Sequence, residues 1–402
     1  MIKRIPVTHL KVGMYVSDLN RDWIPHNNLK KQGILKNEQV IEKISSLGIQ
    51  EIYIDTSRGL DCDAGLTQPE VDQQNQRRLQ TAGEAAPAIQ ARVALTDEMD
   101  NALMLHQQAK GLVNQVMADV KIKKAIDVHS IESLADGMLE SIFRNHNALS
   151  ALGRIRDKDS YLMEHSVNLS VLMSVFGKSI RLGRDVLQQT IIGALLHDIG
   201  KILVPDSVLH KAGKLTEREF SIIKLHAAMG RDILKVTQGV SELSIKIVSE
   251  HHERMDGTGY PEGLKADQIS TYGRMTAIVD VYDAITADRC YHKGMTPTQG
   301  IAKLLEWCDF HLDRGLVNQF IRCIGIYPVG SLVLLESGRL GVVIEANEFE
   351  QRLPTVRVMY HTKFRAPIKV EVIDLSLPKV QDRIVKAVDP RDYKIDIKQF
   401  LV

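Results

Sequence analysis

Histidine and aspartate side chains recur in one fixed order between residues 165 and 283 of the chain. They are His165, the pair His197 and Asp198, His226, the pair His251 and His252, Asp280 and Asp283. Imidazole nitrogens and carboxylate oxygens are the donors that a cluster of divalent metals needs. A buried carboxylate or imidazole without a partner is costly, so a whole set of them is hard to explain as independent core residues. The pattern therefore predicts a metal centre.

Helical spacing turns these side chains toward the protein core. His165 shares a helical face with Leu169, and Asp198 shares one with Ile191 and Leu195. A single inward histidine is usually a core residue with a satisfied hydrogen bond. The prediction depends on ligand-type residues from five successive helices converging on one place.

The chemistry that such a centre supports is metal-assisted hydrolysis. Asp198 has two oxygens and is predicted to bridge two cations, which at about 3.5–4 Å apart can share a hydroxide nucleophile. Nitrogen and oxygen donors without a thiolate suit iron, manganese or zinc. Lys201 lies one helical turn after Asp198, where it could stabilise phosphate charge or protonate a leaving alkoxide. Asp283 is predicted to hold Lys201, with a helix cap or a simple ion pair as the alternative.

A loop and a basic cluster follow the paired histidines. The segment Asp256–Pro261, read as DGTGYP, contains residues that end helices, so it should form a fixed loop at the mouth of the site. Its Tyr260 could stack on a base. Arg289, with Lys293 close by, could bind phosphate oxygens, with an ordinary surface patch as the alternative.

Composition excludes several other classes of protein. The formal net charge is +1, which gives no global attraction for nucleic acid or for an anionic membrane. The four cysteines have no CxxC pairing, which argues against a structural zinc site and a disulfide framework. No run of about 18 apolar residues is present. We therefore expect a cytoplasmic protein that binds neither a nucleic-acid polymer nor a membrane.

The periodicities predict a mainly α protein with small sheet regions at both ends. The expected parts are a small α/β module at 1–62, a flexible linker at 63–89, connecting helices at 90–148, an all-helical metal-binding domain at 149–327 and a β-rich extension at 328–402. In the first module, strands are expected at 7–16 and 51–54 with a helix at 38–47. The connecting helices, split near residues 121–129, should pack on the next domain or on a second subunit in a homodimer.

The motifs HDIGK at 197–201 and HHERMDGTGYP at 251–261 resemble those of the HD-GYP family. These are HD-type metal-dependent phosphohydrolases that hydrolyse the bacterial messenger cyclic di-GMP. DVYDA at 280–284 and the RxY step at 289–291 agree with this resemblance, which covers about residues 150–345. Residues 1–60 also resemble an uncharacterised module that is often fused ahead of such domains.

The resemblance implies a role for each matching residue. One metal would be held by His165, His197, Asp198 and Asp280, and the second by Asp198, His226, His251 and His252. Lys201 would be the catalytic lysine, Asp283 its partner and Arg289 a phosphate contact. Relatives with a third metal use a glutamate where this chain has Tyr161, so two divalent ions are expected. Iron or manganese is preferred, with zinc, nickel, magnesium and calcium as further candidates.

The substrate contacts implied by the resemblance are Gly259, Tyr260, Pro261, Arg289 and Lys293. Lys293 is included because His292 stands where relatives often have lysine or arginine. The predicted function is a cyclic di-GMP phosphodiesterase that forms linear pGpG, with GMP as a further product. One alternative is a weakly active receptor or scaffold that binds partners such as diguanylate cyclase-type signalling proteins through the GYP loop. Another is a hydrolase of a different cyclic dinucleotide or of a phosphomonoester.

Overall fold

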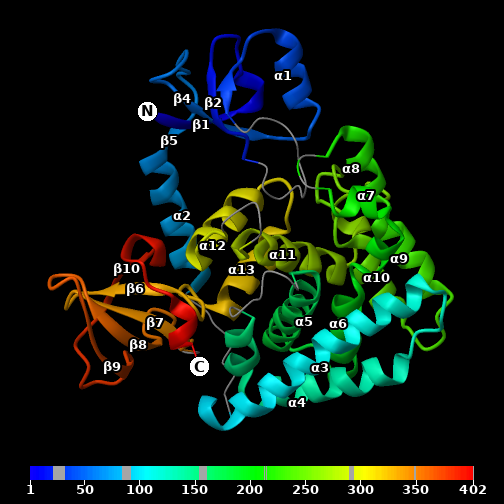
Figure 1. Cartoon of the computed structure of the whole chain (residues 1–402). Helices are drawn as coiled ribbons and strands as arrows, with labels where there is room; N and C mark the ends of the chain where they lie inside the picture. The colour runs from blue at the N-terminus through cyan, green and yellow to red at the C-terminus, as the bar shows by residue number, and fades with distance from the viewer. Residues whose placement is uncertain are drawn as a thin grey trace.

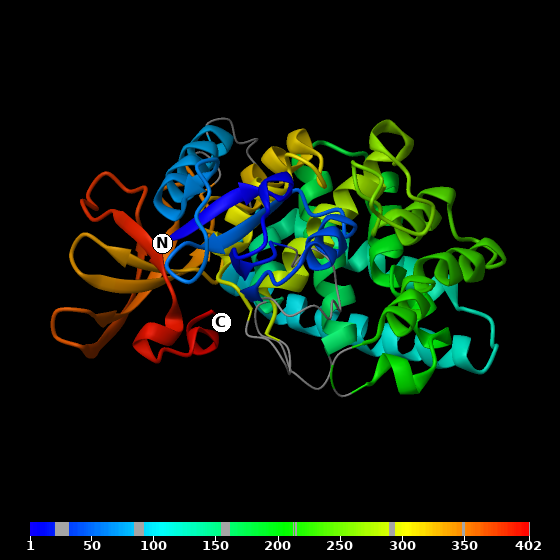
Figure 2. The ribbon, with the colours of Figure 1, turned by 90° about the horizontal axis from the view of Figure 1, so that it is seen from above.

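The computed structural model describes residues 1–20, 32–83, 92–153, 161–211, 213, 215–288, 294–347 and 350–401. An N-terminal sheet module, a central body of helices and a C-terminal sheet occupy the top, the middle and the lower left of Figure 1. Figure 2, seen from above, shows the N-terminal module in front of the helices and the C-terminal sheet to one side. This confirms the predicted mainly α fold with small sheets at both ends. Within the described residues, no helix has the length and apolar character needed to pass through a membrane.

The N-terminal module is an antiparallel sheet with one helix against it. Its described strands follow the order β3-β2-β4-β1-β5. The bounds are β1 Ile2–Pro6, β2 Tyr15–Asp18, β3 Gly33–Ile34, α1 Glu38–Ser45, β4 Glu51–Asp55 and β5 Leu66–Thr67. Ile5 and Ile52 pair across β1 and β4 and are both fully buried, and the Asn37 side chain caps α1. The strand predicted over 7–16 is wrong, because Val7–His9 form a 3-10 helix ahead of β2.

Helix α2 (Gln68–Gly83) occupies most of the segment predicted as a flexible linker at 63–89. The prediction rested on a composition poor in apolar residues, but α2 packs against the helical body through polar contacts. Asn75 is buried, and its amide donates a hydrogen bond of 3.1 Å to the carboxylate of Glu306. Val71 is fully buried and Leu79 packs on the apolar core, so polar contacts add to a small apolar contact in holding α2. The end of the predicted linker, 84–89, lies outside the described residues.

The central body is built from helices that surround one apolar core. Their bounds are α3 Leu95–Lys121, α4 Val128–Leu152, α5 Tyr161–Ser179, α6 Arg184–Leu196, α7 Asp206–Leu209, α8 Glu217–Lys224, α9 His226–Lys235, α10 Glu242–Glu250, α11 Thr271–Thr286, α12 Pro297–Trp307 and α13 Arg314–Ile324. Helices α3 and α4 lie side by side, as Figure 1 shows, and their apolar faces join the core of the helical body. The division of this segment into two helices near residues 121–129 therefore agrees with the prediction.

Helix ends follow the signals in the sequence. The Thr216 hydroxyl accepts a hydrogen bond from the Glu219 amide, and the Glu219 carboxylate accepts one from the Thr216 amide, so that the two residues form a capping box at the start of α8. The core contains aromatic contacts between helices: Phe320 of α13 lies 5.4 Å from Phe176 of α5 and 5.3 Å from Tyr282 of α11, measured between ring centroids. These contacts fix α5 and α11, which both carry predicted ligands.

The C-terminal sheet is antiparallel, with its described strands in the order β10-β6-β7-β8-β9. The bounds are β6 Leu332–Leu335, β7 Arg339–Glu345, β8 Thr355–His361, β9 Ala366–Asp374 and β10 Ile384–Val388. Both faces of the sheet carry buried side chains: Leu332 and Val342 pack with Ala151 of α4 on one face, and Val333 and Val343 on the other. The sequence analysis did not predict β10, which pairs with β6 at the sheet edge.

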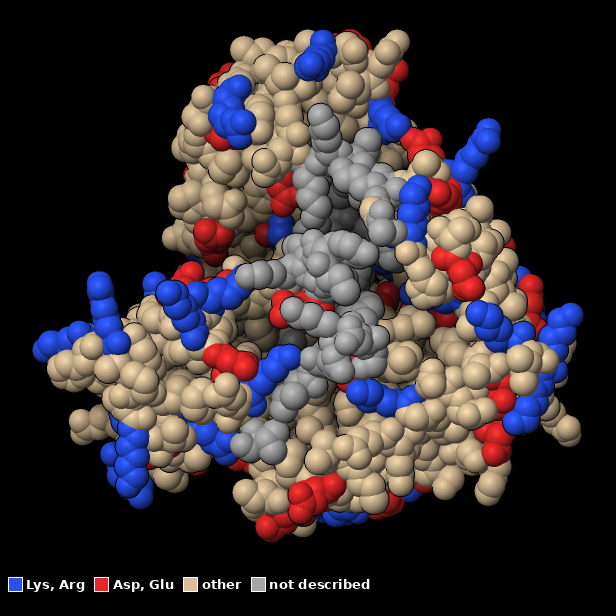
Figure 3. Space-filling view, viewed as in Figure 1, with Lys and Arg blue, Asp and Glu red and all other residues tan. Residues whose placement is uncertain are grey.

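Charged side chains of both signs are intermixed over the face seen in Figure 3. The view shows lysines, arginines, aspartates and glutamates on the N-terminal module, the helical body and the C-terminal sheet alike. This distribution agrees with the formal net charge of +1.

Candidate metal centre

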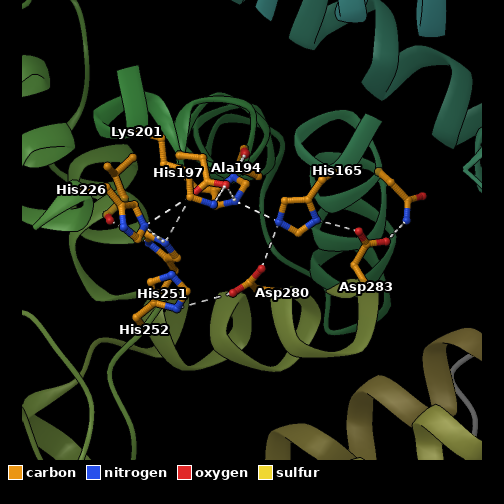
Figure 4. Close-up of polar contacts among 12 residues, drawn as sticks. His165, Ala194, His197, Lys201, His226, His251, His252, Asp280 and Asp283 are labelled. Atoms are coloured by element: carbon orange, nitrogen blue, oxygen red, sulfur yellow. Dashed lines mark hydrogen bonds and ion pairs between the residues drawn. The ribbon is translucent and has the colours of Figure 1, made fainter. Parts of the chain in front are cut away.

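Separate segments of the helical body bring the predicted ligands to one place (Figure 4). These are His165 from α5, His197 and Asp198 just after α6, His226 at the start of α9, His251 and His252 just after α10, and Asp280 from α11. Every one of these side chains is buried, with at most 7% of the residue exposed. The sequence analysis continued the α6 helix through Asp198, whereas α6 ends at Leu196 and Asp198 precedes the 3-10 helix Ile199–Leu203. Its carboxylate nevertheless points inward.

The first group of donor atoms consists of His165, His197 and Asp280. His165 Nε2 lies 3.0 Å from Asp280 Oδ1 and 3.2 Å from His197 Nε2. Asp198 Oδ2 lies 3.3 Å from His197 Nε2, at the edge of this group. Together these atoms form a compact set of nitrogen and oxygen donors from α5, α11 and the end of α6.

The second group consists of Asp198, His226, His251 and His252, whose donor atoms lie within 4.8 Å of one another. His226 Nε2 is 3.2 Å from His251 Nε2 and 3.3 Å from Asp198 Oδ1. His252 presents Nδ1, which is 3.7 Å from Asp280 Oδ2. Asp198 thus directs Oδ2 to the first group and Oδ1 to the second, the arrangement expected of a bridging carboxylate.

Backbone carbonyl groups at helix ends orient three of the histidines. In each case the Nδ1 hydrogen is donated to the carbonyl three residues earlier: His197 to Ala194 at 2.8 Å, His226 to Ile223 at 2.7 Å and His251 to Val248 at 2.8 Å. Each carbonyl belongs to the last turn of its helix, where the regular pattern of backbone hydrogen bonds ends, so it has a lone pair available for the imidazole. Since a carbonyl only accepts, the proton of each neutral ring is on Nδ1. The lone pair of Nε2 therefore faces the centre.

The charge state and the unpaired atoms of the centre fit a divalent cation. Within the described residues, Asp198 Oδ1 and His252 Nδ1 are buried without a hydrogen-bond partner. Burial raises the pKa of the Asp198 carboxyl, but His197 and Lys201 lower it well below its usual value. Burial and the neighbouring imidazoles lower the pKa values of His251 and His252 well below the usual value. His251 and His252 are thus neutral imidazoles and Asp198 is an anionic carboxylate, which are the protonation states that bind a metal.

Lys201 adds a fixed positive charge beside the Asp198 carboxylate. Its Nζ lies 2.5 Å from Asp198 Oδ2, and 17% of its side chain is exposed. The preceding Gly200 allows this approach, because a Cβ there would overlap the His226 carbonyl and come within 2.6 Å of the Gly230 amide nitrogen. Both obstacles are backbone atoms that have no freedom to move aside. The glycine therefore lets the 3-10 helix contact α9.

The chain is similar to known proteins over most of its length, and not only at the metal centre. The HD domain profile matches residues 153–316, and the profile of a domain of unknown function matches residues 2–131. A cyclic di-GMP phosphodiesterase of Pseudomonas aeruginosa is 39% identical over 388 residues, which cover 96% of this chain and 92% of that protein. The chain belongs to the HD-GYP family.

Further relatives match shorter parts of the chain. A cyclic di-GMP phosphodiesterase of Vibrio cholerae is 29% identical over 259 residues, 63% of this chain and 50% of that protein. A 3'3'-cGAMP-specific phosphodiesterase of the same species is 40% identical over 124 residues, 31% of this chain and 24% of that protein. The solved structure of a HDG"Y"P protein from Bdellovibrio bacteriovorus has a TM-score of 0.47 and 17% identity, covering 80% of this chain and 98% of that chain.

The GYP loop of this HD-GYP protein lies against the second ligand group. The ring of Tyr260 is stacked on that of His252, with centroids 4.6 Å apart and an interplanar angle of 36°. Its amide donates a hydrogen bond of 3.2 Å to the His252 carbonyl. Burial raises the pKa of the Tyr260 phenol well above its usual value, so the hydroxyl stays protonated. The substrate-binding role predicted for Gly259, Tyr260 and Pro261 remains a prediction.

Asp283 has a different partner from the one predicted. Its Oδ2 lies 2.7 Å from His165 Nδ1, and its Oδ1 accepts a hydrogen bond from the Asn168 amide, while Lys201 contacts Asp198. Burial lowers the pKa of His165, but the carboxylates of Asp280 and Asp283 raise it to about 9. Asp283 thus orients His165, a predicted metal ligand, because the acceptor at Nδ1 directs Nε2 toward the centre.

Two residues that support the centre were missed in the sequence analysis. Asn168 holds Asp283, and its signal is a polar residue one turn after His165 on the same buried face. Glu253 holds the GYP loop: its carboxylate accepts hydrogen bonds from three loop amides, those of Glu262 at 2.8 Å, Gly263 at 3.1 Å and Leu264 at 2.9 Å. An acidic residue between the paired histidines and a glycine-rich loop is the signal that could have revealed it.

The predicted basic cluster, with Arg289 and Lys293, lies outside the described residues, as do Cys290 and His292. Their predicted phosphate contacts stay predictions.

Proposed function

We propose that this HD-GYP protein is a metal-dependent phosphodiesterase that hydrolyses cyclic di-GMP to linear pGpG. The observation that carries the proposal is the position of Asp198, whose two oxygens face two adjacent groups of nitrogen and oxygen donors. Similarity over 92% of a cyclic di-GMP phosphodiesterase of Pseudomonas aeruginosa supports the choice of substrate. GMP follows if the linear product is hydrolysed again at the same centre.

Two divalent cations match the two groups of donors. His165, His197 and Asp280 with Asp198 would hold the first, and His226, His251 and His252 with Asp198 would hold the second. When bound, the cations would polarise a phosphoryl oxygen and lower the pKa of the water that they bind, so that hydroxide is available near neutral pH. Iron or manganese is our preferred ion, and zinc, nickel, magnesium and calcium are the ions to compare.

The side chains of the protein supply orientation, charge and a proton. In the reaction a water molecule gives up one proton to solvent as its oxygen forms a bond to phosphorus. The bond between phosphorus and the 3′ oxygen breaks, and that oxygen leaves with a proton from a side chain, which is then reprotonated from solvent. Lys201 is the donor for this proton, because its ammonium group is fixed beside Asp198 and is partly exposed. Its charge also stabilises the negative charge that develops on the phosphoryl oxygens. Asp283 keeps His165 in the orientation that ligation requires.

Turnover by the reconstituted protein tests this proposal. The protein is loaded with each metal in turn, the metal content per chain is measured, and cyclic di-GMP, pGpG and GMP are quantified by chromatography. The double variant His197→Ala, Asp198→Ala should lose both metal and turnover. The matched control is His129→Ala, an exposed histidine in the first turn of α4, which should keep both.

The outcomes separate the competing functions. Equal turnover by the wild type and the double variant would refute the assigned metal centre. Tight binding of cyclic di-GMP by the metal-loaded wild type without product would favour the receptor or scaffold function. Faster turnover of 3'3'-cGAMP than of cyclic di-GMP would change the assigned substrate.

Cytoplasmic location, a homodimer and diguanylate cyclase-type partners are separate proposals from the sequence. Cell fractionation, analytical ultracentrifugation and co-purification with a diguanylate cyclase test them one by one.

A further inference from the structure

A buried polar cluster anchors the N-terminal module on α12 of the helical body. Glu306, on α12, is only 5% exposed. Its carboxylate accepts hydrogen bonds from the Tyr53 hydroxyl at 2.9 Å, the Asn75 amide at 3.1 Å and Lys303 Nζ at 3.1 Å. Breaking such a cluster would leave a buried carboxylate without its partners, which is costly. The module is therefore fixed over the helical body, as in Figures 1 and 2.

Elsewhere the module contacts the GYP loop and the helix that leads to His226. Gly48, in the turn after α1, faces Thr258 so closely that a Cβ on Gly48 would lie 2.7 Å from Thr258 Cγ2. Lys43 of α1 forms an ion pair of 2.6 Å with Glu217 at the start of α8. Both side chains of this pair are well exposed, so its contribution to docking is small. The Gly48 contact is the one that involves a predicted substrate loop.

Thr258 is an exposed residue whose hydroxyl and amide are both held by Asp256. Its hydroxyl donates a hydrogen bond of 2.7 Å to Asp256 Oδ1, and its amide donates one of 3.0 Å to the same oxygen. Asp256 Oδ2 in turn lies 3.0 Å from His311 Nδ1. A β-branched side chain with its hydroxyl fixed has a single χ1 rotamer available. An atom added against Cγ2 is therefore expected to displace the loop backbone.

We infer that the N-terminal module positions the GYP loop for substrate through the contact of Gly48 with Thr258. Gly48 and Thr258 are positioning residues, and the metals and Lys201 are not part of the contact. This inference rests on the proposed cyclic di-GMP phosphodiesterase activity. Its consequence is that a change in the module alters substrate binding before it alters the metal centre.

The geometry gives the size of the expected effect. A Cβ on Gly48 must move from 2.7 Å to at least 3.4 Å from Thr258 Cγ2, a displacement of roughly 0.7 Å. Displacements of about 1 Å at positioning groups cost about 100-fold in efficiency, so we expect Gly48→Ala to raise KM about tenfold. The loop does not touch the scissile bond in this scheme, so kcat and metal content should stay near the wild-type values.

A double-mutant cycle tests the contact. Gly48→Ala, Thr258→Ser and the double variant are compared by KM and kcat for cyclic di-GMP, by metal content, and by hydrogen exchange of the loop amides at 253–264. Serine keeps the hydroxyl but lacks Cγ2. The KM of the double variant should therefore be close to the KM of Thr258→Ser alone, well below that of Gly48→Ala. Faster exchange of the loop in Gly48→Ala should be reversed in the same way.

A control variant at another glycine separates the contact from a general disturbance of the module. Gly48 has φ +74 and Gly33, in the same module, has φ +156 with no atom within 4 Å of an added Cβ. Gly33→Ala should therefore keep the wild-type KM. An increase in KM that persists in the double variant, or a loss of metal in Gly48→Ala, would overturn the inference. If the wild type lacks turnover, the proposed function fails, and the reversal of loop exchange still decides whether the contact positions the loop.

Discussion

Replacing Asp283 with asparagine tests whether the first ligand group depends on the carboxylate behind it. Asp283 is fully buried and accepts hydrogen bonds from His165 Nδ1 at 2.7 Å and from the Asn168 amide. Asparagine has nearly the same shape but only one oxygen. If that oxygen faces His165, the amide nitrogen faces the amide of Asn168, donor against donor. Either orientation leaves one of the two hydrogen bonds unmade.

The magnitude follows from the role of such partners at metal sites. Loss of a hydrogen-bonded partner behind a ligating histidine typically lowers metal affinity about 10- to 100-fold, which corresponds to roughly 1.4–2.7 kcal/mol. The effect should fall on the group that contains His165, His197 and Asp280. His226 and His251 keep their own carbonyl partners, so the second group should be affected less.

The assay is a chelator titration of the metal-loaded protein followed by elemental analysis. Asp283→Asn should release one equivalent of metal per chain at a lower chelator concentration than the wild type and keep the other. Asp136→Asn, a half-exposed carboxylate on α4, is the matched control. Release of both equivalents together, or a wild-type titration curve, would refute the assignment of Asp283 to His165.

Three further predictions concern the loop and the core. Glu253→Gln sets an amide against one of the loop N–H groups, so we expect the free energy of unfolding, measured with urea, to fall by about 1–3 kcal/mol. Tyr260→Ala removes the ring stacked on His252, so we expect a higher KM for cyclic di-GMP with unchanged metal content, measured by kinetics and elemental analysis. Burial lowers the pKa of His146 to about 4 from 6.5. The unfolded chain then binds the extra proton between those values, so stability decreases as the pH falls through that window. Between about pH 7 and pH 5 this contribution is roughly 2 kcal/mol, and His146→Gln should remove it from the pH dependence of urea denaturation.

Each of these predictions has a matched control. Glu262→Gln changes an exposed carboxylate next to the same loop, and it should leave the urea midpoint unchanged. Tyr260→Phe keeps the ring, so its KM should stay close to the wild-type value. An equal increase in KM in both tyrosine variants would assign the effect to the hydroxyl. His129→Gln should retain the wild-type pH slope, and a retained slope in His146→Gln would contradict the prediction for that residue.

The ligand set of the site could be predicted from the sequence, whereas the groups that orient it could not. Spacing and residue type were enough to select His165 as an inward-facing donor, because a helix repeats its face regardless of what it packs against. The same pattern selected Asp198, although α6 ends at Leu196 and Asp198 lies just before a 3-10 helix. The Ala194 carbonyl can accept a hydrogen bond from the His197 ring because α6 ends at Leu196, which places this carbonyl in the last turn of the helix. Helix ends depend on tertiary packing and are the least predictable part of a periodic pattern.

The composition of residues 63–89 predicted a flexible linker, because the contacts that hold this segment also depend on tertiary packing. Residues 68–83 are poor in apolar side chains, which is typical of a linker, yet they form α2, in which Asn75 is buried against Glu306 and Leu79 packs on the apolar core. A hydrogen bond between distant parts of the chain has no local signature. The same holds for β10, whose residues pair with β6 without an alternating pattern of their own.

The contact between Gly48 and Thr258 shows where sequence reasoning reaches its limit. A glycine after a short helix predicts a turn, and Gly48 does adopt the positive φ that such a turn needs. The same glycine also leaves the space into which Thr258 fits. The sequence does not show which distant residue occupies the space beside a glycine. Two independent requirements, one on φ and one on volume, are therefore satisfied by one residue type. Only a variant pair that restores the volume while keeping the strain can distinguish them, which is why Thr258→Ser is the decisive partner for Gly48→Ala.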